Sequence, residues 1–154
     1  MSTLREEIRQ GRPFASLEQE AHLSLLRTAA MLDHAMAEAL RPHGITPTQY
    51  NVLRILRGAG PGGLCRNEVR ERMVARVPDA TRLLDRMEAA GLIRRERGEE
   101  DRRFVTTRIS EAGLRLLEEL DEPVQALHRA HFGGLDDVEL RTLIGLLERI
   151  RAAL

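Results

Sequence analysis

The feature that most constrains the fold is a hairpin-like stretch that lies directly between two helical patterns. Gly91 closes a helix, as glycines at helix C-termini commonly do, and that helix has an apolar stripe of Leu83, Leu84, Met87 and Ala90. Two β-like runs follow over residues 92–97 and 103–109, joined by a turn at Gly98–Asp101. Ser110 can then cap the next helix at once. The chain is therefore expected to carry a two-stranded hairpin held between two helices.

Three capping boxes predict where further helices begin. They lie at Ser16–Gln19, Thr46–Gln49 and Asp136–Glu139. The first of these helices should run to about Leu40, and the second should end at the glycine-rich loop of residues 58–63. All three helices have apolar residues at helical spacing, so each should bury one face.

Prolines help to set the remaining helix boundaries. A short helix is expected over residues 66–73, and Pro78 marks the beginning of the next helix. After the hairpin, a helix should run from residue 111 to about residue 131. Pro123 lies inside that helix and should kink it or restart it after Asp121, because proline lacks the N–H that a helix interior uses.

The order of these elements predicts a mainly α fold with a small β-hairpin wing. Residues 46–110 should form a winged helix-turn-helix module for DNA binding, and residues 14–42 and 111–154 flank it in sequence. The flanking helices are long, apolar on one side and have no partner inside the module. Such helices usually bury that side against each other or against a second subunit, so the flanking regions are expected to form a helical dimerisation region.

Composition narrows the function mainly by exclusion. The net charge is zero, which argues against nonspecific polyanion binding, although residues 66–110 hold twelve arginines against nine acids. All the basic residues are arginines, whose planar fork suits phosphates and guanine edges. The sequence lacks an apolar run of membrane-spanning length, a signal-peptide core and a second cysteine, so we expect a cytoplasmic protein without membrane contact. No residue pattern typical of catalysis is present, so an enzyme is not expected.

Four motifs, taken in order, carry a resemblance to a known family. They are Thr46–Tyr50 (TPTQY), Met87–Ile93 (MEAAGLI), Asp101–Arg103 (DRR) and Ile109–Gly113 (ISEAG). Residues 81–113 closely resemble the core signature of the MarR (multiple antibiotic resistance regulator) family, in which a recognition helix leads into a wing. The order of elements is similar over nearly the whole chain, and the spacing of the motifs is specific.

The resemblance implies a homodimeric transcription factor whose first and last helices interlock between subunits. Each winged module would bind one half of a palindromic operator in double-stranded DNA, and a small lipophilic or aromatic effector would release it. We therefore expect a sequence-specific regulator that acts as a repressor and has no cofactor. The alternative is a helical protein-interaction or dimerisation module that has lost DNA binding.

Four residues in or before the predicted recognition helix are candidate DNA contacts, because such helices read bases from their N-terminal residues. Thr81 and Arg82 match a Thr-Arg pair of the family. Arg86 lies one turn later on the same side, and Arg76 precedes the helix as a candidate phosphate contact. Alternatively, Arg82 and Arg86 form a solvated face by pairing with the nearby acids Asp79, Asp85 and Glu88.

The predicted wing supplies further candidates. By the resemblance, Arg103 is the tip arginine that enters a minor groove, where a narrow A·T-rich groove attracts arginine. Arg97 and Arg102 are candidate phosphate contacts, and Asp101 is expected to brace an arginine fork by paired hydrogen bonds. A floppy charged turn is the alternative. Three arginines nearer the base of the wing are expected to be merely solvated, namely Arg94, Arg95 and Arg108.

The turn before the recognition helix departs from the family pattern, which usually offers Ser or Thr near the helix start. Ala75 and Val77 cannot cap a helix with their side chains. Asp79 suits the positive end of a helix but places negative charge close to the expected DNA. Because Asp can accept a hydrogen bond from a cytosine amino group, an unusual base preference is expected.

The remaining candidates concern small ligands. The resemblance places an effector pocket among the first, second and fifth helices, and the residues chosen there are Met31, His34 and Tyr50, with core packing as the alternative. Cys65 is expected to be an inert thiol rather than a redox sensor. His128 and His131 lie three residues apart on one helix, and we expect a surface or interface pair rather than a metal site.

Overall fold

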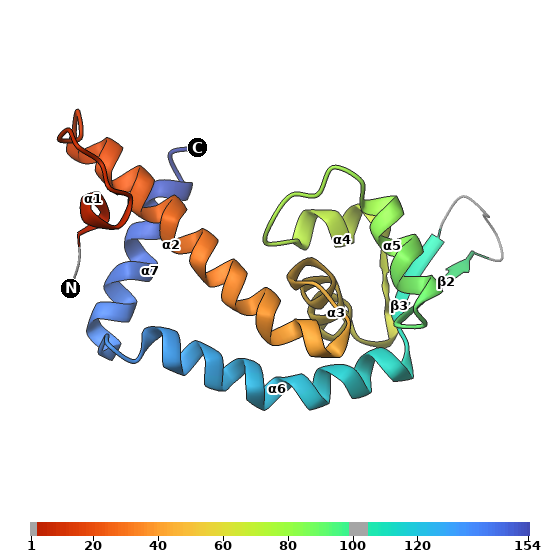
Figure 1. The fold of residues 1–154 in the computed structure, drawn as a ribbon. Coiled ribbons are helices and arrows are strands. Elements are labelled where there is room, and N and C mark those ends of the chain that lie inside the picture. The colour runs from red at the N-terminus through yellow and green to blue at the C-terminus, as the bar shows by residue number, and fades with distance from the viewer. Residues whose placement is uncertain (1–2, 99–104) are drawn as a thin grey trace.

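The computed structural model describes residues 3–98 and 105–154, and it is mainly helical with one small antiparallel sheet (Figure 1). Its elements, in chain order, are α1 (Leu4–Glu7), α2 (Leu17–Leu40), η1 (Arg41–His43), α3 (Pro47–Ala59), η2 (Gly60–Gly62), β1 (Leu64–Cys65), α4 (Arg66–Arg72), α5 (Ala80–Ala89), β2 (Ile93–Arg97), β3 (Val105–Ile109), α6 (Glu111–Phe132) and α7 (Asp137–Arg151). The predicted fold class, mainly α with a hairpin wing, is therefore confirmed.

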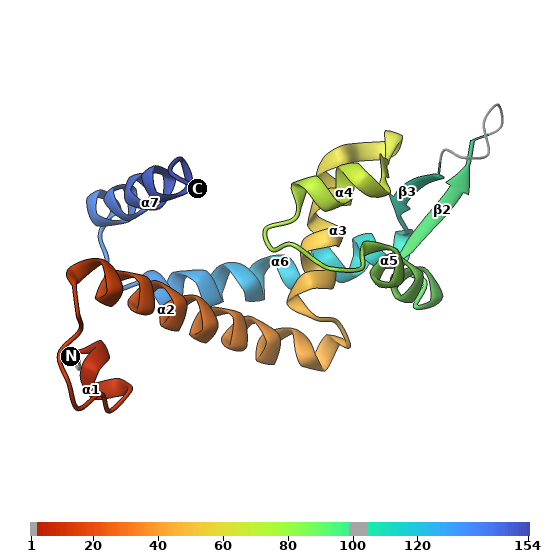
Figure 2. The ribbon, with the colours of Figure 1, turned by 90° about the horizontal axis from the view of Figure 1, so that it is seen from above.

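Two long helices, α2 and α6, connect the two ends of the molecule (Figure 1). At one end lie α3, α4, α5 and the sheet, and at the other end lie α1, α7 and both termini (Figure 2). Helix α3 packs against both α2 and α6. The helix-turn-helix and its wing are thus carried at one end of a long helical frame.

The core lies where α2, α3, α5 and α6 meet the sheet. Its fully buried apolar side chains are Leu40, Val52, Leu53, Leu56, Val69 (from α4), Leu84, Met87, Ile93, Leu117, Leu120 and Val124. Gly113 allows α6 to approach the base of the wing closely, because a Cβ atom there would lie 2.4 Å from the carbonyl oxygen of Leu92. The Ser110 hydroxyl donates to the Gly91 carbonyl at 2.6 Å and accepts from the Gly113 N–H at 3.0 Å. These contacts fix α5, the wing base and α6 relative to one another.

The helix starts follow the capping predictions, with one shift. The Thr46 hydroxyl accepts from the Gln49 N–H at 3.2 Å, and the Gln49 side chain accepts from the Thr46 N–H at 3.0 Å. Helix α7 begins with the same kind of reciprocal pair. At α2, Ser16 accepts from the Gln19 N–H, but the Gln19 side chain accepts from the Ala15 N–H. The capping box predicted that the Gln19 side chain would accept from the Ser16 N–H, but the donor is the preceding residue, Ala15.

One predicted helix boundary is wrong, and one of the two outcomes predicted for Pro123 does not occur. Helix α5 begins at Ala80 instead of Pro78, because the Asp79 side chain caps it by accepting from the Arg82 N–H at 2.9 Å. Helix α6 continues through Pro123, so the predicted restart after Asp121 does not occur, and Figure 1 shows one bowed helix. Burial of apolar side chains on both sides of Pro123 offsets the hydrogen bond that proline cannot make.

Two short elements, β1 and α1, were not predicted, and neither were the single-turn 3-10 helices η1 and η2. Strand β1 has two residues and exists because it pairs with β3, where Leu64 lies opposite Thr107. The wing strands β2 and β3 pair in antiparallel register, with Ile93 opposite Ile109 and Arg97 opposite Val105. The other short element, α1, has a capping box of its own but buries none of its residues.

Candidate nucleic-acid interface

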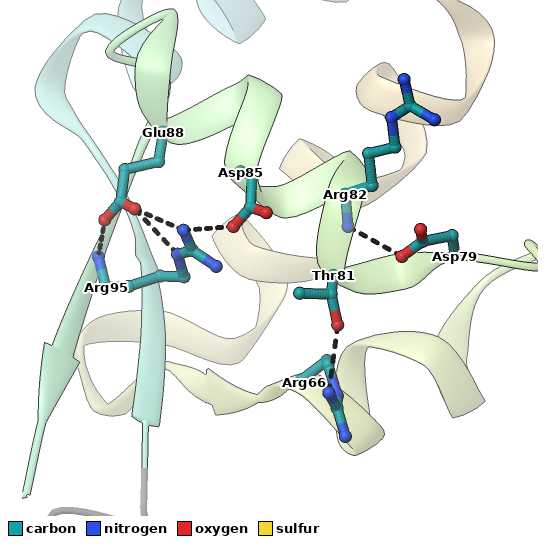
Figure 3. Close-up of polar contacts among 7 residues, drawn as sticks. All are labelled: Arg66, Asp79, Thr81, Arg82, Asp85, Glu88 and Arg95. Carbon is teal, nitrogen blue, oxygen red and sulfur yellow. Dashed lines mark hydrogen bonds and ion pairs between the residues drawn. The ribbon is translucent and has the colours of Figure 1, made fainter.

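Helix α5 presents a polar face opposite its buried face. Of the apolar stripe predicted from the sequence, Leu84 and Met87 are buried in the core and Leu83 is half-buried, but Ala90 is exposed, so the prediction is wrong for this last residue, which lies beyond the end of the helix. Thr81, Arg82 and Arg86 are all exposed, and Figure 3 shows the Arg82 side chain extending away from the helix while Thr81 points towards Arg66 on α4. Helical spacing places Arg82 and Arg86 on the side opposite Leu84, so these two predicted DNA contacts share one exposed surface and Thr81 lies beside it.

The acids of α5 are bound by an arginine of the wing. The Arg95 guanidinium donates to the Glu88 carboxylate at 2.6 and 2.9 Å and lies 2.6 Å from an Asp85 oxygen (Figure 3). The Arg95 N–H also donates to Glu88, at 3.0 Å. These hydrogen bonds lower the pKa of Glu88 and raise the pKa of Arg95. The expectation that Arg95 is merely solvated is therefore wrong.

This arrangement bears on the alternative in which the α5 arginines pair with neighbouring acids. Asp85 and Glu88 bind Arg95, and the Asp79 carboxylate accepts from the Arg82 backbone instead of its side chain. Within residues 3–98 and 105–154, neither the Arg82 nor the Arg86 guanidinium forms an ion pair. Both cations are therefore available to an anionic partner.

The base of the wing is fixed by a second arginine. The Arg108 Nε donates to the Pro61 carbonyl at 2.8 Å, and its Nη1 pairs with the Glu96 carboxylate. Arg108 thus ties β3 to β2 and to the loop after α3, which corrects the expectation that it is only solvated. Arg94 is exposed, as expected.

Thr81 is joined to a residue that sequence reasoning missed. Arg66, the first residue of α4, donates to the Thr81 hydroxyl at 3.0 Å (Figure 3). The hydroxyl proton of Thr81 then remains able to donate outward. Arg66 and Thr81 line one cavity with Arg95 and Thr107. No local pattern could have indicated this contact, because it joins two helices through the fold.

The turn between α4 and α5 is also held by an unpredicted residue. Asn51 on α3 accepts a hydrogen bond from the Val74 N–H at 2.9 Å. The predicted phosphate contact Arg76 lies exposed in the same turn. Asn51 therefore limits how far this turn can move relative to the core.

The wing lies partly within the described chain. Arg97 is exposed at the end of β2. Asp101, Arg102 and Arg103, together with part of the predicted turn and of the second predicted strand, lie outside the described residues. Their roles stay predictions.

The three effector candidates lie in different surroundings. Met31 is exposed and lines a groove with residues of α1 and α2 and with His131. His34 is exposed, whereas Tyr50 is buried and its hydroxyl accepts from Arg54 at 3.0 Å. The cavities found in the described chain do not bring all three residues together.

Other candidate groups have ordinary surroundings. Cys65 is half-buried at the start of α4, and its N–H donates to the Glu68 carboxylate at 2.7 Å. This hydrogen bond is the main reason why the pKa of Glu68 is lowered. His128 is exposed on α6. Among the described residues, no three His, Cys, Asp or Glu side chains gather as a metal site would require, and no helix could cross a membrane.

Comparison with known proteins agrees with this geometry. A family model described as the MarR family matches residues 43–103, which contain the helix-turn-helix and β2. Among curated proteins, an uncharacterised HTH-type transcriptional regulator of Bacillus subtilis, YkoM, is 29% identical over 142 residues, covering 88% of this chain and 90% of its own. Both matches concern transcriptional regulators.

Two solved structures extend the similarity over most of the chain. A MarR transcription factor from Planctomyces limnophilus is 40% identical, with a TM-score of 0.68, and covers 88% of this chain and 98% of its own. A MarR variant from E. coli in complex with operator DNA is 25% identical, with a TM-score of 0.75, and covers 97% of this chain and 99% of its own. The similarity therefore includes the long helices as well as the winged module.

Proposed function

Because this chain belongs to the MarR family of DNA-binding transcriptional regulators, we propose that it represses transcription by binding a palindromic operator as a homodimer. The single observation that carries this proposal is the exposed face of α5, where Arg82 and Arg86 have no carboxylate partner in the described chain. An arginine fork of this kind suits guanine edges and phosphates. A dimer seated on an operator that overlaps a promoter would exclude the polymerase from it.

The wing is the second part of the proposed interface. Arg97 and Arg102 would contact phosphates, Arg103 would enter a minor groove, and Asp101 would brace one of these forks. The contacts of Arg95 and Arg108 support this proposal, because the Arg95 ion pairs hold the wing against α5, and Arg108 joins β3 to β2 and to the Pro61 carbonyl. A wing fixed at its base can place its tip at a defined distance from the recognition helix.

The proposed homodimer rests on apolar surface at the other end of the molecule. Helix α7 buries none of its residues, and Ile144, Leu146 and Ile150 are about half exposed. On α2, Leu26 and Met31 are also more than half exposed. Exposed apolar surface of this extent usually marks an interface. We therefore assign residues 14–42 and 111–154 to dimerisation and residues 46–110 to DNA binding.

An effector that releases the protein from DNA is a further part of the proposal. A small lipophilic or aromatic molecule would bind near Met31, His34 and Tyr50, between the dimerisation helices and the DNA-binding lobe. Tyr50 lies on α3, which packs against both α2 and α6, so a ligand there could shift the winged module relative to the frame. Calorimetric titration with candidate aromatic acids, repeated with Tyr50→Ala, would test this site.

The proposed function is tested by mobility-shift titration on DNA upstream of the gene, over a series of salt concentrations. We expect a specific complex whose affinity falls with salt, by a slope of about 0.9 for each phosphate neutralised. Arg82→Ala should weaken binding by about 1–3 kcal/mol. Arg129→Ala removes the same charge from α6, where Arg129 pairs with Glu122, and should bind like the wild type.

The alternative function, a helical interaction module without DNA binding, is not favoured, because the α5 surface has kept two unpaired arginines in the described chain. A specific complex that Arg82→Ala weakens would exclude this alternative. Absence of any specific shift, from a protein that remains folded, would instead favour the interaction module.

A further inference from the structure

The N-cap of α5 is an aspartate, and its geometry bears on which base pairs this protein can read. The Asp79 Oδ1 accepts from the Arg82 N–H at 2.9 Å, and the residue is exposed (Figure 3). The second oxygen, Oδ2, has no hydrogen-bond partner in residues 3–98 and 105–154. One carboxylate oxygen therefore holds the helix while the other faces outward.

No described cation neutralises this carboxylate. Figure 3 shows the Arg82 guanidinium extending away from Asp79, and the nearby Arg66 donates to Thr81. An unpaired carboxylate repels phosphates, since like charges that face each other across an interface are strongly disfavoured. The Arg82 N–H, which could otherwise bind a phosphate at the helix N-terminus, is already occupied. Asp79 therefore disfavours the binding of a phosphate at the start of α5.

Since phosphates are disfavoured, the DNA groups that can bind the Asp79 Oδ2 are the hydrogen-bond donors on base edges. In the major groove these donors are the N4 amino group of cytosine and the N6 amino group of adenine. Adenine places its N7 acceptor beside N6, where it would repel a carboxylate, whereas the edge of cytosine beside N4 carries no acceptor. Cytosine is therefore the better match.

We propose that Asp79 is a specificity-determining residue that accepts a hydrogen bond from cytosine N4 when α5 lies in the major groove. This inference rests on the proposed function, because it requires sequence-specific DNA binding. It adds that each half-site contains one C·G pair selected by a carboxylate, at the position that the first turn of α5 reaches.

The test is selection of bound sites from a random DNA library, with the wild type, Asp79→Asn and Asp79→Ser. Asparagine can still cap α5 through its oxygen, but its other atom becomes an NH₂ donor that prefers acceptors on a base. We expect the wild type to select C at one position of each half-site, by roughly 10- to 100-fold. Asp79→Asn should shift that position to a base with an acceptor, and Asp79→Ser should lose the preference.

Glu6→Gln is the matched control. The Glu6 carboxylate accepts from the Thr3 N–H at 2.8 Å in the cap of α1, outside the residues assigned to DNA binding or dimerisation, so the variant makes the same change from carboxylate to amide away from α5. It should select the same sites as the wild type. Circular dichroism of each variant checks that its helices are retained.

The outcomes separate this inference from the proposed function. If the wild type enriches a site and Asp79→Asn enriches the same base at every position, the role of Asp79 is overturned while the proposed function stands. If the wild type enriches no sequence, the proposed sequence-specific DNA binding is wrong, and the role of Asp79 that depends on it is wrong as well.

Discussion

At the scale of single residues, close contacts at the junction of α5, β2, β3 and α6 decide how the winged module is assembled. Ser110 both caps α6 and donates to the carbonyl of Gly91, which has a positive φ of 73° that suits glycine. Gly113 lies in the first turn of α6, against the Leu92 carbonyl. Two glycines and a serine, which contribute little apolar surface, therefore position α5, the base of the wing and α6.

Gly113→Ala should lower the free energy of unfolding by about 1–3 kcal/mol, because overpacking forces neighbouring backbone to shift. The added Cβ would lie 2.4 Å from the Leu92 oxygen, which is backbone and cannot rotate away. Urea unfolding measures the change. Gly58→Ala is the control, since a Cβ at this helical position meets no atom within 4 Å; it should be neutral or stabilising. Equal stability of Gly113→Ala and the wild type would contradict the close contact.

At the scale of elements, the contact between α5 and the wing depends on ion pairs with one arginine. Arg95 on β2 binds Glu88 and Asp85 on α5, and these side chains are only partly exposed. A half-buried ion pair also joins Arg57 on α3 to Asp121 on α6, and the hydrogen bonds from Arg57 lower the pKa of Asp121. The pairs of Arg95 hold two elements of the winged module together, and the pair of Arg57 with Asp121 joins α3 of that module to α6 of the helical frame.

These pairs predict a loss of stability in acid. Since Arg95 lowers the pKa of Glu88 in the folded state, the stabilisation is fully present above the ordinary glutamate pKa of about 4.3. It should be lost as the pH falls through the lowered value. Glu88→Gln should remove this part of the pH dependence in urea unfolding between neutral and acidic pH.

Glu119→Gln provides the comparison for that experiment. Glu119 is exposed on α6 and has no ion pair in the described chain, so the variant should keep the wild-type pH dependence. If Glu88→Gln and Glu119→Gln give the same pH profile, the contact between Glu88 and Arg95 does not contribute to stability.

At the scale of the whole molecule, the chain has two ends with different surfaces. The arginines Arg82 and Arg86 are exposed on α5, and apolar side chains are exposed on α7. Figure 1 shows these two helices at opposite ends of the molecule. Helix α2 is well buried only near its C-terminal end, where Leu40 enters the core. One end therefore suits an anionic partner, and the other end suits a second apolar surface.

Ile144→Glu should convert the proposed dimer into a monomer, because it places a charge on the apolar surface of α7, where Ile144 is 54% exposed. Sedimentation velocity at micromolar concentration measures the change. Val74→Glu makes the same substitution at a residue that is 91% exposed in the turn before α5, and it should stay dimeric. If the wild type itself sediments as a monomer, the proposal that the protein is a homodimer is wrong.

Local signals in the sequence determined most of the secondary structure. The capping boxes, Gly91 and Ser110 act within four residues or fewer, so they predicted the beginnings of α2, α3, α6 and α7 and the position of the hairpin. The start of α5 was missed because Asp79, and no earlier residue, supplies the cap. Thr81 and Arg82 could be chosen as candidate DNA contacts from the family resemblance, and local helical spacing added Arg86.

Tertiary structure alone decided which charges are free and which are paired. Arg95 could not be distinguished from Arg94 in the sequence, yet the pairing of β2 with β3 directs Arg95 towards Glu88 and leaves Arg94 exposed. The contacts of Arg66 with Thr81 and of Asn51 with the Val74 N–H likewise join separate elements. Sequence patterns describe the face that a residue occupies on its own helix or strand. Packing decides what lies opposite that face, because it brings together residues that are distant in the chain.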